Sequence, residues 1–249
     1  MNCSMKYLVA ALCAACSITF AASIPKSAGA VSPKNSAKAA EAPTASDKRA
    51  VEILDQISKR FSSVTTAYAK FDQVKENHTF NEKSATQGEM WYQKPDRFRC
   101  EYTGKNESDR LTNLITNNTL YVGLPHFKQV ERYPFENSVD TKRQLDRILL
   151  GFGLATQEIL KSYKVSLLEE NTAKQTAQLR FVPTFQDNYG IDYIVIVMDL
   201  KNARPINLQI QEGEDRTTIT IRDFKLNPKI DSKKFAVDFP KNWELIDKV

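Results

Sequence analysis

Apolar positions between residues 47 and 64 recur at intervals of three and four, which is the period of an amphipathic helix. These positions are Ala50, Ile53, Leu54, Ile57, Phe61 and Val64. Charged side chains, among them Lys48, Glu52 and Lys59, occupy the opposite face. Ser46 precedes the stretch, and serine is a common N-terminal cap. We therefore expect a helix that is capped by Ser46 and buries one face.

From residue 67 onward the apolar period changes to two, which is typical of strands with one buried face. The alternating apolar residues of the first three strands include Phe71, Met90, Tyr92, Phe98, Cys100 and Tyr102. Further strands are predicted over residues 111–116, 119–124, 127–132, 165–169, 175–183, 191–200, 205–212 and 216–226. The segment 191–200 is apolar on both faces, so we expect it to be central and covered on both sides.

A helical period returns only in the middle of the chain. Residues 141–151 place Leu145, Ile148 and Leu149 on one stripe with Phe152, and Gly151 and Gly153 end the pattern. A second short helix is expected over residues 155–163. Helices therefore interrupt a run of strands.

The order of elements favours an α+β fold that is mostly β. About ten consecutive strands with short links need closure or a cover for their edges. We predict a single strongly curved antiparallel sheet that forms an unclosed β-barrel, with a lid of helices over its apolar face. Such a sheet is wide enough to leave room for an apolar ligand.

The N-terminus has the order of features found in secretory signal peptides. Lys6 precedes an uncharged run, Pro25 interrupts it, and Ala28-Gly29-Ala30 offers a small-residue cleavage site. We predict a signal peptide over 1–30 that is cleaved after Ala30, a disordered linker over 31–45 and one domain over 46–249. A membrane anchor and a lipoprotein signal ending at Cys16 are the alternatives.

Composition and motifs argue against nucleic-acid binding and against catalysis. The net charge of +5 falls to +3 once the segment with Lys6 and Lys26 is removed, which is too mild for a nucleic-acid interface. Only Cys100 then remains of the four cysteines, so no internal disulfide is expected. His78 and His126 have no spaced partners for a metal, and the chain beyond residue 30 carries no nucleotide-binding or nucleophile motif. We expect no enzyme activity, no metal and no cofactor.

Residues 88–103, GEMWYQKPDRFRCEYT, resemble the signature of the periplasmic outer-membrane lipoprotein carrier family (LolA-type). The segments 69–73, 119–121, 129–130 and 231–240 resemble other motifs of that family in the same order. The resemblance spans about residues 47–246.

This resemblance implies an unclosed β-barrel with a helical lid and a hydrophobic cavity. A protein of this type accepts the acyl chains of lipoproteins from an inner-membrane lipoprotein-releasing ABC transporter. It crosses the periplasm as a soluble monomer and delivers them to an outer-membrane lipoprotein receptor. Lipid anchors gain about 0.8 kcal/mol per buried methylene, so a soluble carrier must offer a matching apolar surface.

The resemblance also suggests site residues. Lys94 stands where the family has an arginine that hydrogen-bonds the lid backbone, and Cys100 stands where many members have tryptophan. Lysine keeps the charge of that latch but loses the planar fork of donors. The predicted cavity residues are Phe71, Met90, Tyr92, Phe98, Cys100 and Tyr102, and the predicted lid residues are Leu145, Ile148, Leu149, Phe152 and Leu154. Ordinary core packing is the alternative for each of them.

Two other functions fit the same pattern. The first is a carrier or sensor for another lipid or glycolipid, or an envelope-stress regulator with the same architecture. The second is an enzyme that acts on an envelope lipid, which would need convergent polar groups inside the pocket. We do not expect Lys94, Gln73 and Tyr102 to form a catalytic site of this kind.

Overall fold

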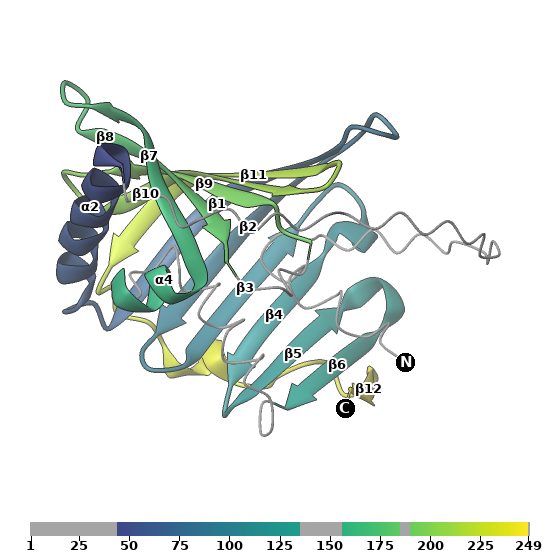
Figure 1. Cartoon of the computed structure of the whole chain (residues 1–249). Coiled ribbons are helices and arrows are strands. Elements are labelled where there is room, and N and C mark those ends of the chain that lie inside the picture. Colours follow the sequence, from purple (N-terminus) through teal and green to yellow (C-terminus); the bar gives the residue numbers. More distant parts are fainter. Residues whose placement is uncertain (1–43, 135–155, 185–189, 249) are drawn as a thin grey trace.

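The computed structural model describes residues 44–134, 156–184 and 190–248. They form one 12-stranded sheet in the order β12-β6-β5-β4-β3-β2-β1-β11-β10-β9-β8-β7, which curves strongly without closing into a barrel (Figure 1). The strands are β1 (Thr66–Asn77), β2 (Glu82–Gln93), β3 (Arg97–Thr103), β4 (Leu111–Thr116), β5 (Thr119–Leu124), β6 (Gln129–Pro134), β7 (Tyr163–Asn171), β8 (Thr176–Pro183), β9 (Tyr193–Asp199), β10 (Arg204–Glu212), β11 (Asp215–Leu226) and β12 (Glu244–Asp247). The predicted fold class is confirmed.

Tight turns connect most neighbouring strands. The turn between β4 and β5 consists of Asn117 and Asn118, both in the left-handed region with φ of 49° and 56°. Asparagine tolerates this conformation better than most residues because its short side chain can hydrogen-bond locally. Asn81, with φ of 52°, plays the same part between β1 and β2. These turns make the neighbours antiparallel, whereas β12 alone joins its partner β6 in parallel.

Helix α2 (Ala45–Phe61) is the amphipathic helix that the sequence predicts. Its N-cap is Thr44 rather than Ser46, because the Thr44 side chain and the Asp47 side chain form a reciprocal capping box. Ser46 lies inside the first turn instead, and its hydroxyl donates to the carbonyl of Leu167 in β7 at 2.7 Å. The second helix, α4 (Thr156–Ser162), precedes β7 directly.

One apolar cluster holds α2 against the inner, concave face of β7–β10. Ile53, Ile57 and Phe61 of the helix pack with inner-face residues such as Leu179 and Ile196. Burying side chains of this size stabilises the fold by about 1.5–3 kcal/mol each. Arg49 adds a two-pronged ion pair at the edge, with Nε 3.0 Å from Glu170 Oε2 and Nη2 2.7 Å from Glu170 Oε1. The helix therefore covers the inner face of β7–β10.

The segment 227–248 crosses the outer, convex face of β2–β5. Phe235 is buried there against Trp91 and Leu114, in a short 3₁₀ helix, η5 (Ser232–Phe235). The ring of Phe239 lies over Gly123, where a Cβ atom would come within 2.4 Å of Phe239 Cε1. Glycine is therefore required in β5 for the segment to approach this closely.

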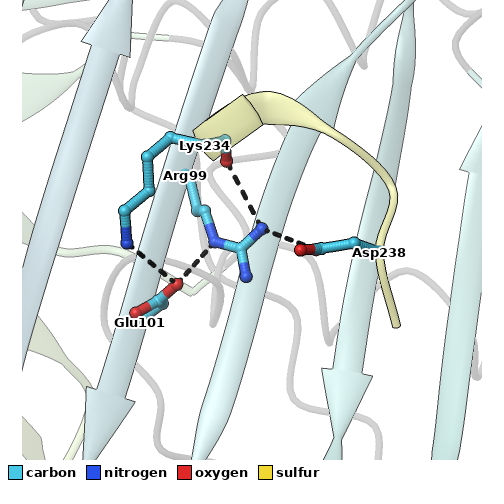
Figure 2. Close-up of polar contacts among 4 residues, drawn as sticks. All are labelled: Arg99, Glu101, Lys234 and Asp238. Atoms are coloured by element: carbon cyan, nitrogen blue, oxygen red, sulfur yellow. Dashed lines mark hydrogen bonds and ion pairs between the residues drawn. The ribbon is translucent and has the colours of Figure 1, made fainter. Parts of the chain in front are cut away.

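A polar network fixes the same segment to β3 (Figure 2). Arg99 donates to Glu101 at 2.6 Å, to the carbonyl of Lys234 at 3.3 Å and to Asp238 at 3.3 Å. Lys234 lies 3.9 Å from Glu101 and also 3.9 Å from the centre of the Trp91 ring. Since the Arg99 side chain is only 14% exposed, these contacts are partly shielded from water.

Three details of the sequence prediction need correction or completion. Strand β6 begins at Gln129 rather than at residue 127, because Pro125–Phe127 form a 3₁₀ turn that ends with Lys128 at φ 51°. Strand β9 is buried on both faces but is the third strand from one edge and not central. The sheet is not wholly antiparallel, since β12 and β6 run in parallel. The predicted signal peptide, residues 31–43 of the predicted linker and the predicted lid residues lie outside the described residues, whereas Thr44 and Ala45 of that linker belong to the start of α2.

Candidate functional site

The structure brings the predicted cavity residues together on the inner face of β1–β3. They are Phe71, Met90, Tyr92, Phe98, Cys100 and Tyr102, and none is more than 7% exposed. Strand register explains the grouping, because Met90 lies opposite Cys100 and Tyr92 lies opposite Phe98. All belong to one apolar cluster that continues through Ile115 of β4 and Leu120 of β5.

This second cluster differs from the first in what covers it. As far as the described part of the chain shows, its buried members come only from strands and include no residue of α2 or α4. Leu208, Phe224 and Leu226 contact both clusters and join them into one inner face. The cluster members carry no charge. An uncharged, strand-built surface of this kind suits hydrocarbon better than any polar ligand.

Phe71 and Gly88 are paired across β1 and β2 at the centre of this surface. The Phe71 ring fills the space above the glycine, and its edge meets the Tyr102 ring with centroids 5.4 Å apart at 74°. Edge-to-face contacts of this kind are preferred by aromatic pairs. Sequence reasoning missed Gly88 as a site residue, although an isolated glycine in a strand is a known sign of close approach.

Burial sets the protonation states inside the cluster. It raises the pKa of the Cys100 thiol to about 12, so this free cysteine stays protonated at neutral pH. Burial also raises the pKa of Tyr92, with a smaller contribution from Asp96. Neither group is therefore an activated nucleophile or base, which is consistent with a binding surface.

Polar side chains interrupt the apolar surface one step beyond Phe71. Gln73 and Thr86 face each other across β1 and β2 and are 2% and 4% exposed. The alternation of β1 places Gln73 on the inner face, but sequence reasoning gave it no binding role. The signal that could have identified it is an amide at a position that the period of two assigns to the interior.

The predicted latch residue, Lys94, lies at the end of β2 beside the last turn of α2. Its Nζ donates to the carbonyl of Phe61 at 3.3 Å and to that of Ser62 at 3.1 Å. A cation at a helix C-terminus is favourable because the terminal carbonyls carry partial negative charge. Lys94 therefore holds the backbone of a helix that covers the sheet, and its role as a latch for the lid stays a prediction.

Two further properties of the described residues bear on function. Within residues 44–134, 156–184 and 190–248, no group of three or more His, Cys, Asp or Glu is placed to hold a metal ion. None of the helices in these ranges has the length and apolar character needed to cross a membrane.

Comparison with protein families gives one match over most of the domain. Residues 62–238 match the family described as outer membrane lipoprotein carrier protein LolA. No curated protein sequence matches the chain.

Solved structures are similar to the chain at low sequence identity. An uncharacterised conserved protein from Thermus thermophilus is 13% identical with a TM-score of 0.53, and the match covers 80% of this chain and 99% of that one. A putative outer membrane lipoprotein-sorting protein domain from Vibrio parahaemolyticus is 14% identical with a TM-score of 0.42, over 76% and 97% of the two chains. A LolA superfamily protein from Nitrosomonas europaea is 11% identical with a TM-score of 0.40, over 77% and 99%.

Proposed function

The chain belongs to the family of the outer membrane lipoprotein carrier protein LolA, and we propose that it is a periplasmic carrier of acylated lipoproteins. Family membership supports a lipoprotein-binding role outside the cytoplasm. In the proposal, the acyl chains lie against the inner face of β1–β5, and the protein carries them from the inner to the outer membrane. The chain performs no catalysis in this role.

The single observation that carries the proposal is the second apolar cluster. Phe71, Met90 and Phe98 are buried on strands, in a cluster whose described members include no helical residue. A ligand that displaces a movable cover from this surface would bury its own hydrocarbon in exchange. Each buried methylene contributes about 0.8 kcal/mol. Burial of one acyl chain therefore supplies enough free energy to offset the cost of exposing the apolar side of the cover to water.

The proposal assigns the partners that the family's role requires. An inner-membrane lipoprotein-releasing ABC transporter would load the carrier, and an outer-membrane lipoprotein receptor would unload it. The carrier would act as a monomer, with the signal peptide cleaved after Ala30. N-terminal sequencing of the periplasmic protein tests the cleavage site directly.

Mass spectrometry of the protein purified from the periplasm tests the proposal. We expect a co-purified triacylated lipoprotein in the wild type, and less of it in Met90→Gln, which places a polar amide on the inner face. Lys70→Ala, on the outer face of β1, is the matched control and should retain the cargo. A free phospholipid or glycolipid as the only cargo would favour the alternative lipid carrier, and a chemically converted lipid would favour an enzyme.

If the protein purified from the periplasm carries no cargo, a second measurement tests the proposal. The purified protein is then mixed with a synthetic triacylated lipopeptide, and binding is followed by calorimetry. Saturable binding with a negative heat-capacity change, the mark of apolar burial, supports the carrier. Absence of binding at lipopeptide concentrations below micelle formation refutes it.

A further inference from the structure

Strand β1 changes in character along its inner face. Phe71 is apolar, Gln73 is polar and uncharged, and Lys75 is charged, each two residues from the last and therefore on the same side of the sheet. An acylated protein shows the same order: hydrocarbon, then ester and amide groups at the terminal cysteine, then a hydrated peptide. The polar position in the middle of this series, Gln73, is therefore the candidate for recognising the ester and amide groups.

Gln73 and Thr86 lie at this middle position as direct cross-strand partners. Gln73 is also opposite the apolar Ile219 of β11, while Thr217, the next inner-face residue of β11, is polar and buried. Gln73 Oε1 and Thr86 Oγ1 are both buried, and neither has a hydrogen-bond partner among the residues that the structure describes. Native proteins leave few buried polar atoms in this state, so two neighbouring ones need an explanation.

The fold itself gives no reason for polar side chains here. Removing one partner of a buried hydrogen bond is costly, but apolar residues of the same shape at both positions are neutral or stabilising. Methionine and valine have nearly the shapes of glutamine and threonine, so an apolar pair is the direct alternative at these two positions. An amide and a hydroxyl that lack partners among the described residues therefore point to a ligand with complementary groups.

We propose that Gln73 and Thr86 form a polar subsite that binds the amide and ester groups where acyl chains join the terminal residue of a lipoprotein. Gln73 Oε1 accepts a hydrogen bond from the N–H of the amide-linked acyl chain. The Thr86 hydroxyl donates to an ester carbonyl. The subsite rests on the proposed carrier function and adds the means by which the protein distinguishes an acylated protein terminus from plain hydrocarbon.

The length of the apolar surface next to the subsite suits an acyl chain. From Thr86 to Tyr92 the strand advances about 20 Å, at about 3.3 Å per residue. One leaflet of a bilayer core, which is the length of an acyl chain, is about 15 Å thick. A chain anchored at Gln73 and Thr86 can therefore run over the Phe71 ring and along Met90 without leaving the apolar cluster.

Binding of two matched ligands by two near-isosteric variants tests the subsite. The ligands are a triacylated lipopeptide and its analogue with ether links in place of the ester and amide groups. The wild type should bind the lipopeptide at least about tenfold more tightly than the analogue. The double variant Gln73→Met/Thr86→Val should lose this preference and bind the two about equally.

Folding controls separate a binding role from a structural one. The subsite predicts that the double variant unfolds at the same or a higher urea concentration than the wild type, while Thr86→Ser keeps the hydroxyl and the ligand preference. If the double variant does not fold, Thr86→Val alone takes its place.

An unchanged preference in a folded variant overturns the subsite alone. Failure of the wild type to bind the lipopeptide overturns the carrier function and the subsite with it.

Discussion

The ring of Phe71 lies directly on the backbone of Gly88, so that a Cβ atom at position 88 would fall 2.2 Å from Phe71 Cζ. This distance is shorter than any non-bonded carbon contact, and the ring cannot stay where it is once a side chain is added. Because Phe71 also meets Tyr102 at 5.4 Å, displacement of the ring would disturb the centre of the inner face. The pair thus links a glycine in one strand to the shape of the proposed binding surface.

Substitution Gly88→Ala is expected to lower the free energy of unfolding by about 1–3 kcal/mol, as overpacking of a core does. Urea unfolding measures this change. Phe71→Leu in the same chain should recover most of the loss, since the shorter side chain leaves space for the new methyl group. A double variant that is no more stable than Gly88→Ala would show that the two residues do not conflict.

The ion pair between Arg49 and Glu170 is expected to hold α2 on β7. Substitution Glu170→Gln should lower the free energy of unfolding by about 0.5–1 kcal/mol, the upper end for partly exposed pairs with two-pronged geometry. Glu52→Gln is the control, because Glu52 contacts the same arginine but is 61% exposed. The difference between the variants should shrink in 1 M salt, and equal effects of both would contradict the special role of Glu170.

The alternating pattern was sufficient to predict which residues share the inner face, and register was needed to predict how they contact one another. A period of two assigns Phe98, Cys100 and Tyr102 to one face without any knowledge of neighbouring strands. The contact between Phe71 and Gly88 depends on how β1 and β2 are aligned, and the pair Arg49–Glu170 joins residues that are 121 positions apart. The isolated Gly88 signals a close approach, but the local sequence does not identify the partner in either pair.

Short elements were the hardest to predict. Strand β12 has only four residues, and its parallel pairing with β6 is stabilised by contacts such as Arg132–Asp247 that bring together distant parts of the chain. A serine before the apolar period predicts an N-cap at Ser46, whereas Thr44 is the residue with an acid three positions later. The spacing of Thr44 and Asp47 is that of a capping box and is visible in the sequence.

Lys94 provides a test of the predicted latch. Substitution Lys94→Met removes the donor to the carbonyls of Phe61 and Ser62 and should cost about 0.3–1 kcal/mol of stability. If Lys94 holds the cover closed, the variant should also take up lipopeptide several-fold faster in stopped-flow fluorescence. Lys94→Arg should behave like the wild type, because arginine can donate to the same carbonyls. Faster uptake in both variants would argue against a latch based on these hydrogen bonds.

Glu212 is expected to give the stability a pH dependence. Burial raises its pKa, Lys75 opposes the shift, and Asp215 and Asp192 add to it. The folded state therefore keeps a proton that the unfolded chain has lost, so this contribution is present below the unfolded pKa of about 4.3 and disappears as the pH rises through the higher folded value.

The corresponding experiment compares Glu212→Gln with the wild type in urea at pH 4, 6 and 8. The variant should gain stability relative to the wild type as the pH increases, because its side chain has no proton to lose. Glu214→Gln, at an exposed neighbouring position, is the control and should follow the wild type. Parallel pH profiles for Glu212→Gln and the wild type would show that the half-buried carboxyl of Glu212 does not control this dependence.

Cys100 offers a direct measure of how often the inner face opens. The thiol is 1% exposed and its pKa is raised to about 12, so at pH 8 only about one molecule in ten thousand carries the reactive thiolate. We expect the native protein to react with a disulfide reagent far more slowly than the urea-unfolded chain, and far more slowly than an exposed cysteine introduced at Thr103 in the same strand.

Bound lipopeptide should slow the labelling of Cys100 further if acyl chains lie on β1–β3. Lys94→Met should accelerate it if the latch is real, since reagent and lipid would have to enter through the same opening. Rapid labelling of the folded wild type would mean that Cys100 is not enclosed. Water would then reach the inner face too readily for that face to hold an acyl chain.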